Sequence, residues 1–424
     1  MPGPFELAAR KKSPPAAVPP AANAQVEDVA SRPAMAGLLK WFARNRQWID
    51  EQHLALCRIP APTFQEGARA AAVAAMLESF GWNAKIDRAG NVTATLPAAR
   101  PGPVVALTAH LDTVLAPRRP EEIRLEANGT FTGPGVSDNG AGLAALVALG
   151  RALAENPGAM RSAQLLLVAN VGEEGDGNLS GMRYLCQQSP WAERLQALVV
   201  MDGPDVSHVT AVALASRRFE IVISGAGGHS WSDRGMANPV HALARAIACF
   251  CDDRSAAPPA APSSWNFGVI EGGTTVNAIP ASARVKVDLR SHSPAVLDGL
   301  AAALESAFER AARHENETAR SGRISVRIRE TGSRPGGALA PDSPLLEVVR
   351  SVDAFLAIRS ELDCASTDAN VPLSMGLPAI SIGAGGSGGG AHTPAEWYSP
   401  EGRELGLRRI ALLVALLLEN LPRP

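Results

Sequence analysis

Four apolar runs stand out along the chain, and polar residues with acidic or imidazole side chains follow them. The runs cover residues 104–109, 164–170, 195–200 and 379–382. Uninterrupted apolar runs of this length are typical of parallel strands that are buried on both faces of a sheet. Open α/β sheets bind ligands where such strands end. We therefore expect the polar residues that follow these runs to lie close together.

Helical patterns separate these predicted strands. Apolar residues recur at helical spacing from residue 35 to the Pro-rich break near residue 60, and again over 66–80, 140–153 and 410–418. Two shorter strand patterns, 83–87 and 91–96, come before the first long run. Strands that alternate with helices predict a layered α/β domain with a mixed sheet.

The pattern changes between residues 215 and 331. Strand, helix, strand, strand, helix and strand patterns follow one another, at 219–224, 239–250, 266–270, 284–290, 294–314 and 324–328. This order predicts a split βαββαβ unit of the ferredoxin-like type. It is inserted into the α/β domain, because the fourth apolar run comes only afterwards. We expect the catalytic domain to comprise 35–214 and 332–424, with 1–34 as a disordered extension rich in Pro and Ala.

Composition narrows the class of protein. A net charge of −2 and a pI near 6.5 give no electrostatic footprint for nucleic acid or for an anionic membrane. No apolar stretch approaches the roughly 18 residues that suggest a membrane span. The five cysteines are scattered and form no CxxC pair, so neither a disulfide framework nor a thiolate zinc site is indicated. A reducing, cytoplasmic environment fits best.

Five residues after the predicted strands, or in the loop before a helix, have side chains that bind divalent cations. They are His110, Asp138, Glu174, Asp202 and His392. Imidazole and carboxylate groups suit zinc, and also manganese or cobalt. One shared aspartate could bridge two ions roughly 3.5–4 Å apart, as in two-metal hydrolases. Two such ions would lower the pKa of a bound water from about 15.7 towards roughly 7.

Two further residues have candidate roles beside these ligands. Glu173 precedes Glu174, so its side chain should point elsewhere and stay free to act as a general base and then a general acid. An isolated pair of glutamates is more often a solvated turn, but this pair follows a buried strand. Asp112 lies two residues after His110, and an extended chain points both side chains the same way. One of these two can bind a metal ion while the other orients the site.

Several motifs together resemble those of the co-catalytic zinc peptidases and deacylases. They are TAHLDTV, GPGVSDNGAG, GEEG, VMDGP and GGGAHTPAEW, and the resemblance covers about residues 37–424. It implies that His110 and Asp202 bind opposite metals, that Asp138 bridges them, and that Glu174 and His392 complete the ligand set. It also implies Glu173 as the base, Asp112 as the residue that orients His110, and a cis bond between Asp138 and Asn139.

The same resemblance extends to the inserted domain. It implies that His229, in a GGHS motif, reaches the oxyanion of the scissile carbonyl from a lid. In several relatives this histidine comes from the partner subunit, so a homodimer is expected through the inserted domain. Asn277 and Arg290 would hold the backbone or the carboxylate of the substrate. Without the resemblance, these three would be interpreted as a loop histidine, a turn residue and a surface charge.

These observations predict a hydrolase with two divalent metals that cleaves an amide bond in a small peptide. A di- or tripeptidase, or an aminopeptidase-like activity, is favoured. Hydrolysis of N-acyl amino acids, as in acetylornithine deacetylase, is the alternative. A catalytically inactive binding protein is a third possibility, but such a chain should lack ligands or the base, and none is missing here.

Overall fold

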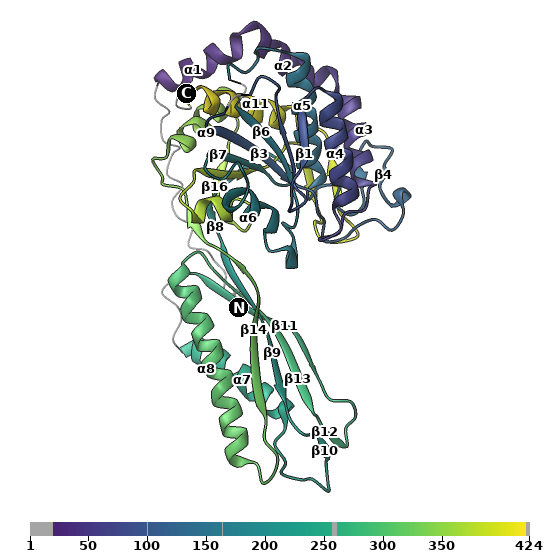
Figure 1. The fold of residues 1–424 in the computed structure, drawn as a ribbon, viewed down its shortest axis with the longest axis vertical. Coiled ribbons are helices and arrows are strands. Elements are labelled where there is room, and N and C mark those ends of the chain that lie inside the picture. The colour runs from purple at the N-terminus through teal and green to yellow at the C-terminus, as the bar shows by residue number, and fades with distance from the viewer. Residues whose placement is uncertain (1–19, 100, 163, 257–260, 421–424) are drawn as a thin grey trace, which may run out of the picture.

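The computed structural model describes residues 20–99, 101–162, 164–256 and 261–420, and it consists of two domains (Figure 1). The large domain combines the N-terminal part of the chain with the C-terminal part. The inserted domain, which contains β9 to β14 and helices α7 and α8, extends away from it. Two antiparallel strands, β9 and β14, connect the domains.

A nine-stranded mixed sheet forms the centre of the large domain. Eight strands follow the order β1-β2-β6-β3-β7-β17-β8-β15, and β16 pairs with β8. Their bounds are β1 (Asn83–Ile86), β2 (Val92–Thr95), β3 (Val104–His110), β6 (Leu165–Asn170), β7 (Leu195–Met201), β8 (His208–Ala213), β15 (Gly337–Ala338), β16 (Glu361–Ala365) and β17 (Ala379–Ile382). The four strands predicted from apolar runs are neighbours and parallel. Their carboxyl ends therefore meet at one edge of the sheet, as expected.

Helices cover both faces of this sheet. Alternate side chains of β3 point to opposite faces, so Val105 and Leu107 belong to one core while Val104 and Ala106 belong to the other. The first core includes α2 (Pro33–Arg44), α3 (Arg46–Cys57), α4 (Gly67–Ser79), α5 (Gly140–Glu155), α9 (Pro344–Phe355) and α11 (Arg403–Glu419). The second includes α6 (Ser180–Gln187) and α10 (Asn370–Ser374). The sheet is thus buried on both sides, which explains the continuous apolar runs.

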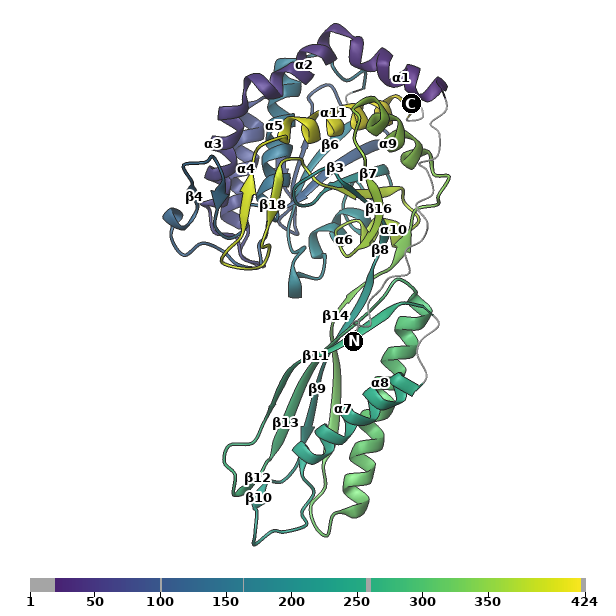
Figure 2. The ribbon, with the colours of Figure 1, turned by 180° about the vertical axis from the view of Figure 1, so that it is seen from behind.

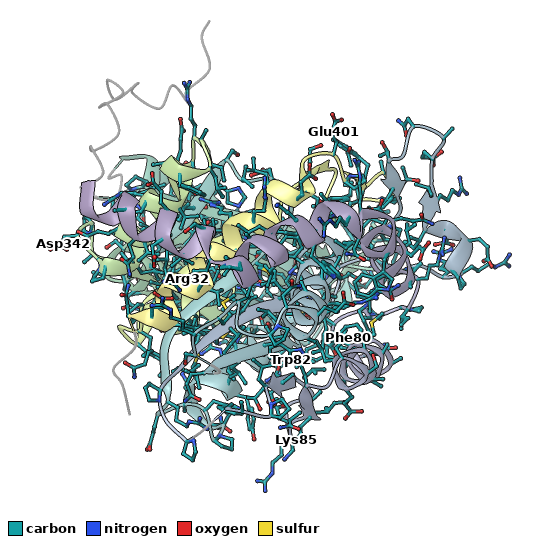
Figure 3. All side chains as sticks on the ribbon, turned by 90° about the horizontal axis from the view of Figure 1, so that it is seen from above. Arg32, Phe80, Trp82, Lys85, Asp342 and Glu401 are labelled. Carbon is teal, nitrogen blue, oxygen red and sulfur yellow. The ribbon has the colours of Figure 1, made fainter. Side chains whose placement is uncertain are left out.

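The expectation of a disordered extension is wrong for residues 20–34. Helix α1 (Pro20–Ser31) packs near α9 and α11, and its Val26 and Val29 are fully buried in the main core. Arg32, which is labelled in Figure 3 and directly follows α1, forms an ion pair with Glu419 of α11. The expectation was based on the high Pro and Ala content of the segment. It overlooked two valines that lie one helical turn apart. Residues 1–19 of the predicted extension lie outside the described residues.

The inserted domain has the predicted ferredoxin-like order. Its four strands are β9 (Ala215–Ser224), β11 (Ser263–Gly272), β13 (Ser282–Ser291) and β14 (Ser325–Arg334), all antiparallel in the order β11-β13-β9-β14. Helices α7 (Pro239–Ala256) and α8 (Pro294–Thr318) cover one face (Figure 2). Two short strands, β10 (Gly228–His229) and β12 (Ala278–Ile279), pair at the end far from the large domain.

A small four-stranded sheet brings distant loops of the large domain together. It comprises β4 (Arg124–Leu125), β5 (Phe131–Thr132), β18 (Ser387–Gly389) and β19 (Trp397–Ser399), in the order β18-β19-β5-β4. The loop that begins after β5 thus lies beside the loop between β18 and β19. Within the part of the chain described, no helix is long and apolar enough to cross a membrane.

Candidate active site

The five predicted metal ligands converge at the carboxyl edge of the large sheet. His110 is the last residue of β3, Asp202 directly follows β7, and Glu174 lies in the loop after β6. Asp138 and His392 come from the two loops that the small sheet holds side by side. These five residues are far apart in the sequence, and the parallel strands and the small sheet bring them together.

Asp138 lies between two groups of potential ligand atoms. Its Oδ1 is 3.1 Å from Nε2 of His110, which is also 3.7 Å from Oδ1 of Asp202. Its Oδ2 is 3.0 Å from Nε2 of His392, which is 2.9 Å from Oε1 of Glu174. Within each group of three, the ligand atoms lie within 4.8 Å of one another. The two groups share the Asp138 carboxylate.

The charge of this cluster fits divalent cations. Hydrogen bonds with Asp138 and Glu174 raise the pKa of His392 to about 10. Burial lowers the pKa of His110, but Asp112, Asp138 and Asp202 outweigh burial and raise it well above its ordinary value. Carboxylates that draw a proton onto each imidazole in this way would equally stabilise a metal ion in its place. Two imidazoles and three carboxylates form a donor set of the kind that zinc, manganese or cobalt takes.

Asp112 lies beneath the candidate ligands and contacts His110, the loop of Glu173 and Glu174, and Thr63. It is fully buried, and its two carboxylate oxygens accept hydrogen bonds from the backbone N–H groups of Glu173 and Glu174, at 3.0 and 2.9 Å. Its Oδ1 is 3.5 Å from Nδ1 of His110, and that nitrogen is 2.9 Å from the Asp112 carbonyl oxygen. Thr63 donates a further hydrogen bond to the carboxylate. Asp112 therefore holds the imidazole and the glutamate loop in register.

The loop that carries Asp138 is held by a buried carboxylate that the sequence analysis did not identify. Glu396 is 3% exposed and accepts hydrogen bonds from the backbone N–H groups of Gly135, Ser137 and Asp138, at 2.7 to 2.8 Å. The bond between Asp138 and Asn139 is cis, as expected. Glu396 stands inside the PAEW segment of a quoted motif, but nothing in its spacing indicated which loop it would hold.

Glu173, the candidate base, is buried beside this cluster. One of its carboxylate oxygens lies within 4.8 Å of ligand atoms of both His110 and Glu174. Arg334 donates to its Oε1 at 2.9 Å, and this arginine also escaped the sequence analysis. Burial raises the pKa of Glu173 well above its ordinary value, although the guanidinium of Arg334 opposes that shift. A carboxylate in this setting has the affinity for a proton that a general base needs.

The three predicted residues of the inserted domain do not join the cluster within one chain. His229 and Asn277 lie beside each other at the far end of the domain, where the Ser230 N–H donates to the Asn277 carbonyl oxygen at 3.0 Å. Figures 1 and 2 show this end, at β10 and β12, well away from the carboxyl ends of β3 and β7. Arg290 forms an ion pair with Asp288 of its own strand, at 2.6 Å.

The fold and the cluster together define a class of enzyme, the hydrolases with an α/β catalytic domain and an inserted antiparallel domain. The chain belongs to Peptidase family M20/M25/M40, whose model matches residues 106–419. It is therefore a member of a family of peptide- and amide-cleaving enzymes.

Individual relatives are distant. The uncharacterized protein YqjE of Bacillus subtilis is 24% identical over 361 residues, which cover 80% of this chain and 91% of that protein. Succinyl-diaminopimelate desuccinylase of Burkholderia mallei is 26% identical over 228 residues, 50% of this chain and 59% of that enzyme.

Solved structures share the fold across nearly the whole chain. A tripeptidase of Staphylococcus aureus has a TM-score of 0.72 at 18% identity, covering 89% of this chain and 99% of its own. The aminopeptidase PepT of Bacillus cereus has a TM-score of 0.68 at 20% identity, covering 88% and 98%. At these identities the likeness establishes the fold alone.

Proposed function

We propose that this protein hydrolyses an amide bond in a small peptide with the help of two divalent cations, and that these cations are zinc. His110 and Asp202 would hold one cation, Glu174 and His392 the other, and Asp138 both. The observation that carries this proposal is the position of the Asp138 carboxylate, with one oxygen near each imidazole, at 3.1 and 3.0 Å. A carboxylate between two metal-binding groups is the arrangement of two-metal hydrolases.

When bound, two cations at this position would lower the pKa of a water molecule and polarise the scissile carbonyl. Glu173 lies next to that position and is itself held by Arg334. It accepts the proton of the attacking water and then delivers it to the leaving amine. Asp112 keeps His110 and the loop of Glu173 and Glu174 in place during these transfers.

Small peptides are the favoured substrates, and two observations on similar proteins support this choice. The tripeptidase of Staphylococcus aureus and PepT of Bacillus cereus share the fold over almost their full length. N-acyl amino acids are the second candidate class, because desuccinylases are among the similar sequences. Both reactions break an amide bond, so the same cluster serves either.

We further propose that the inserted domain acts as a lid and as the dimer interface, and that the protein works in the cytoplasm. His229 and Asn277 lie together at the far end of this domain, so a partner subunit offers a route by which they could reach a cluster. Arg290 lies on the same strand as Asp288, at the end nearer the large domain. Its side chain would hold a substrate carboxylate once released from Asp288.

A substrate panel on metal-reconstituted protein tests the proposed function. Metal-stripped protein is loaded in turn with zinc, manganese or cobalt and incubated with di- and tripeptides and with N-acetyl and N-succinyl amino acids. We expect release of free amino acid from small peptides, and no release by the stripped protein. Preferential hydrolysis of the N-acyl compounds would favour the second candidate. No metal-dependent hydrolysis of any compound would contradict the proposed function and favour a binding protein.

A further inference from the structure

Arg334 lies at the junction between the inserted domain and the large domain. It is the last residue of β14, where the chain returns from the inserted domain to the large domain, and it pairs in register with Ser216 of β9. Its side chain is only 7% exposed. A buried guanidinium needs partners for its N–H groups, because an unpaired buried charge is costly. The hydrogen-bond partners of Arg334 therefore indicate the role of this side chain.

Those partners belong mainly to the candidate base. Nη1 donates to the carboxylate Oε1 of Glu173 at 2.9 Å, and Nη2 donates to the carbonyl oxygen of the same residue. Nη1 also lies 3.1 Å from the hydroxyl of Ser366, from the segment before α10. One arginine thus holds both ends of Glu173, its backbone and its side chain. Among the described residues, only Arg334 forms a hydrogen bond with the Glu173 carboxylate.

The contacts with Arg334 leave one carboxylate oxygen of Glu173 free to accept a proton. The hydrogen bond from Arg334 occupies one carboxylate oxygen, and no described residue donates to the other. The carboxylate also lies within reach of His110 and Glu174, on the side of the metal cluster. A general base needs a carboxylate that is held in a fixed position and has one oxygen free to accept a proton. The arrangement around Glu173 meets both conditions.

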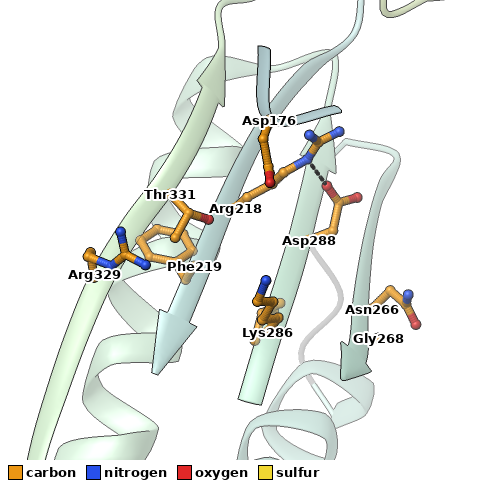
Figure 4. A pocket seen from close by; sticks show the side chains of 10 residues that line it. Asp176, Arg218, Phe219, Asn266, Gly268, Lys286, Asp288, Arg329 and Thr331 are labelled. Atoms are coloured by element: carbon orange, nitrogen blue, oxygen red, sulfur yellow. Dashed lines mark hydrogen bonds and ion pairs between the residues drawn. The ribbon is translucent and has the colours of Figure 1, made fainter. Parts of the chain in front are cut away.

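Further residues of the inserted domain hold the loop that follows Glu174. Arg218 of β9 donates to the carbonyl oxygen of Gly175 at 2.7 Å, and the Ser333 N–H donates to the Asn178 side chain at 3.0 Å. Figure 4 shows the Arg218 side chain, which also pairs with Asp288, close to Asp176 of this loop. Any change in the orientation of the inserted domain must therefore move or break contacts to the loop of the candidate base.

We propose that Arg334 is a positioning residue that holds Glu173 ready for proton transfer, and that it links the orientation of the inserted domain to the position of this base. The proposal rests on the proposed function, in which Glu173 is the base. It gives β14 a second role besides connecting the domains. Substrate binding that reorients the inserted domain would, through Arg334, adjust the carboxylate that receives the proton.

Kinetics of arginine variants test this proposal. In Arg334→Gln, Glu173 loses both contacts, and we expect kcat to fall by about 100-fold with KM within about twofold, since small misplacements of reacting groups have effects of this size. Arg334→Lys keeps the charge but loses the planar fork, so it should recover part of kcat. The matched control is Arg217→Gln, because Arg217 of β9 pairs with Glu330 of β14 but makes no hydrogen bond to Glu173 or its loop in the described residues. It should keep kcat within about twofold.

Metal content and melting temperature are measured for each variant, so that loss of metal or of folding is recognised separately. The proposal is overturned if Arg334→Gln keeps the wild-type kcat, if its defect lies in KM, or if Arg217→Gln loses kcat equally. A KM defect would mean that Arg334 binds substrate instead. If the wild type hydrolyses no compound of the panel, the proposed function fails, and this proposal fails with it. An active wild type with an unaffected Arg334→Gln variant contradicts the role of Arg334 alone.

Discussion

At the scale of single residues, two buried carboxylates hold the loops that carry the candidate ligands. Asp112 accepts two backbone N–H groups from Glu173 and Glu174, while Glu396 accepts three from the loop of Asp138. Each carboxylate fixes the conformation of its loop, because a charged acceptor forms strong hydrogen bonds with backbone donors. The geometry of the cluster therefore depends on residues that would not contact a metal ion.

Replacing Asp112 by Asn should weaken the cluster without removing a ligand. The amide cannot accept at both positions, so the loop of Glu173 and Glu174 loses one contact. We expect metal affinity or kcat to fall by about 10–100-fold, the usual effect of such supporting residues. Asp87→Asn is the matched control, because Asp87 also accepts several backbone N–H groups, in a turn between β1 and β2. Equal loss of metal affinity in both variants would contradict the specific role of Asp112.

His53 makes the stability of the protein depend on pH. It is fully buried beneath the loop of Asp138, where its Nε2 lies 2.7 Å from the Val136 carbonyl oxygen and Arg403 donates to its Nδ1. Burial, aided by Arg403, lowers the pKa of His53 well below 6.5. Below about pH 6.5, His53 binds a proton in the unfolded chain but not in the folded one. The free energy of unfolding therefore decreases as the pH falls.

The measurement compares His53→Gln with the wild type between pH 8 and pH 5. The wild type should lose up to about 1.4 kcal/mol of stability per pH unit more than the variant below about pH 6.5. The difference between the two proteins should be constant above that pH. Parallel curves throughout would mean that His53 binds a proton as readily in the folded protein as in the unfolded chain, contrary to its buried position.

Sequence reasoning indicated which candidate ligands come together better than it indicated the residues that hold them, and the reason is physical. His110, Asp202 and Glu174 follow buried parallel strands, so the fold itself brings them together. Glu396 and Arg334 contact residues more than 150 positions away, through loops and an interdomain connection that local patterns do not specify. His229 and Asn277 were matched by motif, and a motif does not reveal how far the inserted domain extends from the cluster.

At the scale of elements, helix α1 shows how composition can mislead. The segment is rich in Ala and Pro and was expected to be disordered. Val26 and Val29, one turn apart on a helix, both reach the main core and are fully buried. Two buried valines on one face are enough to attach a short helix, because burying each side chain contributes about 1.5–3 kcal/mol.

Shortening Val26 to Ala should therefore lower the free energy of unfolding by about 1–3 kcal/mol, through lost burial and the cavity left behind. Gln25→Ala is the matched control, since Gln25 is exposed on the same helix. Chemical denaturation measures both. A Val26→Ala variant as stable as the control would mean that α1 does not pack in solution as described.

At the scale of the whole molecule, the inserted domain holds His229 and Asn277, at β10 and β12, far from the cluster of its own chain. If His229 acts across a dimer, two inactive variants can complement each other. Glu173→Gln leaves a chain with an intact His229, and His229→Ala leaves one with an intact cluster. Mixed in equal amounts under conditions of subunit exchange, they should recover about a quarter of wild-type activity, because half of the dimers then contain one complete site. No recovery, despite exchange, would contradict action in trans.

The central claim is that the cluster around Asp138 holds two cations and that Glu173 supplies the base. The most direct test measures metal content and peptide hydrolysis of the wild type and Glu173→Gln on the same preparations. The account predicts about two ions per chain in both proteins, and hydrolysis reduced by about 100-fold or more only in the variant. A variant that hydrolyses peptides as fast as the wild type would contradict this account, as would a wild type that binds no metal.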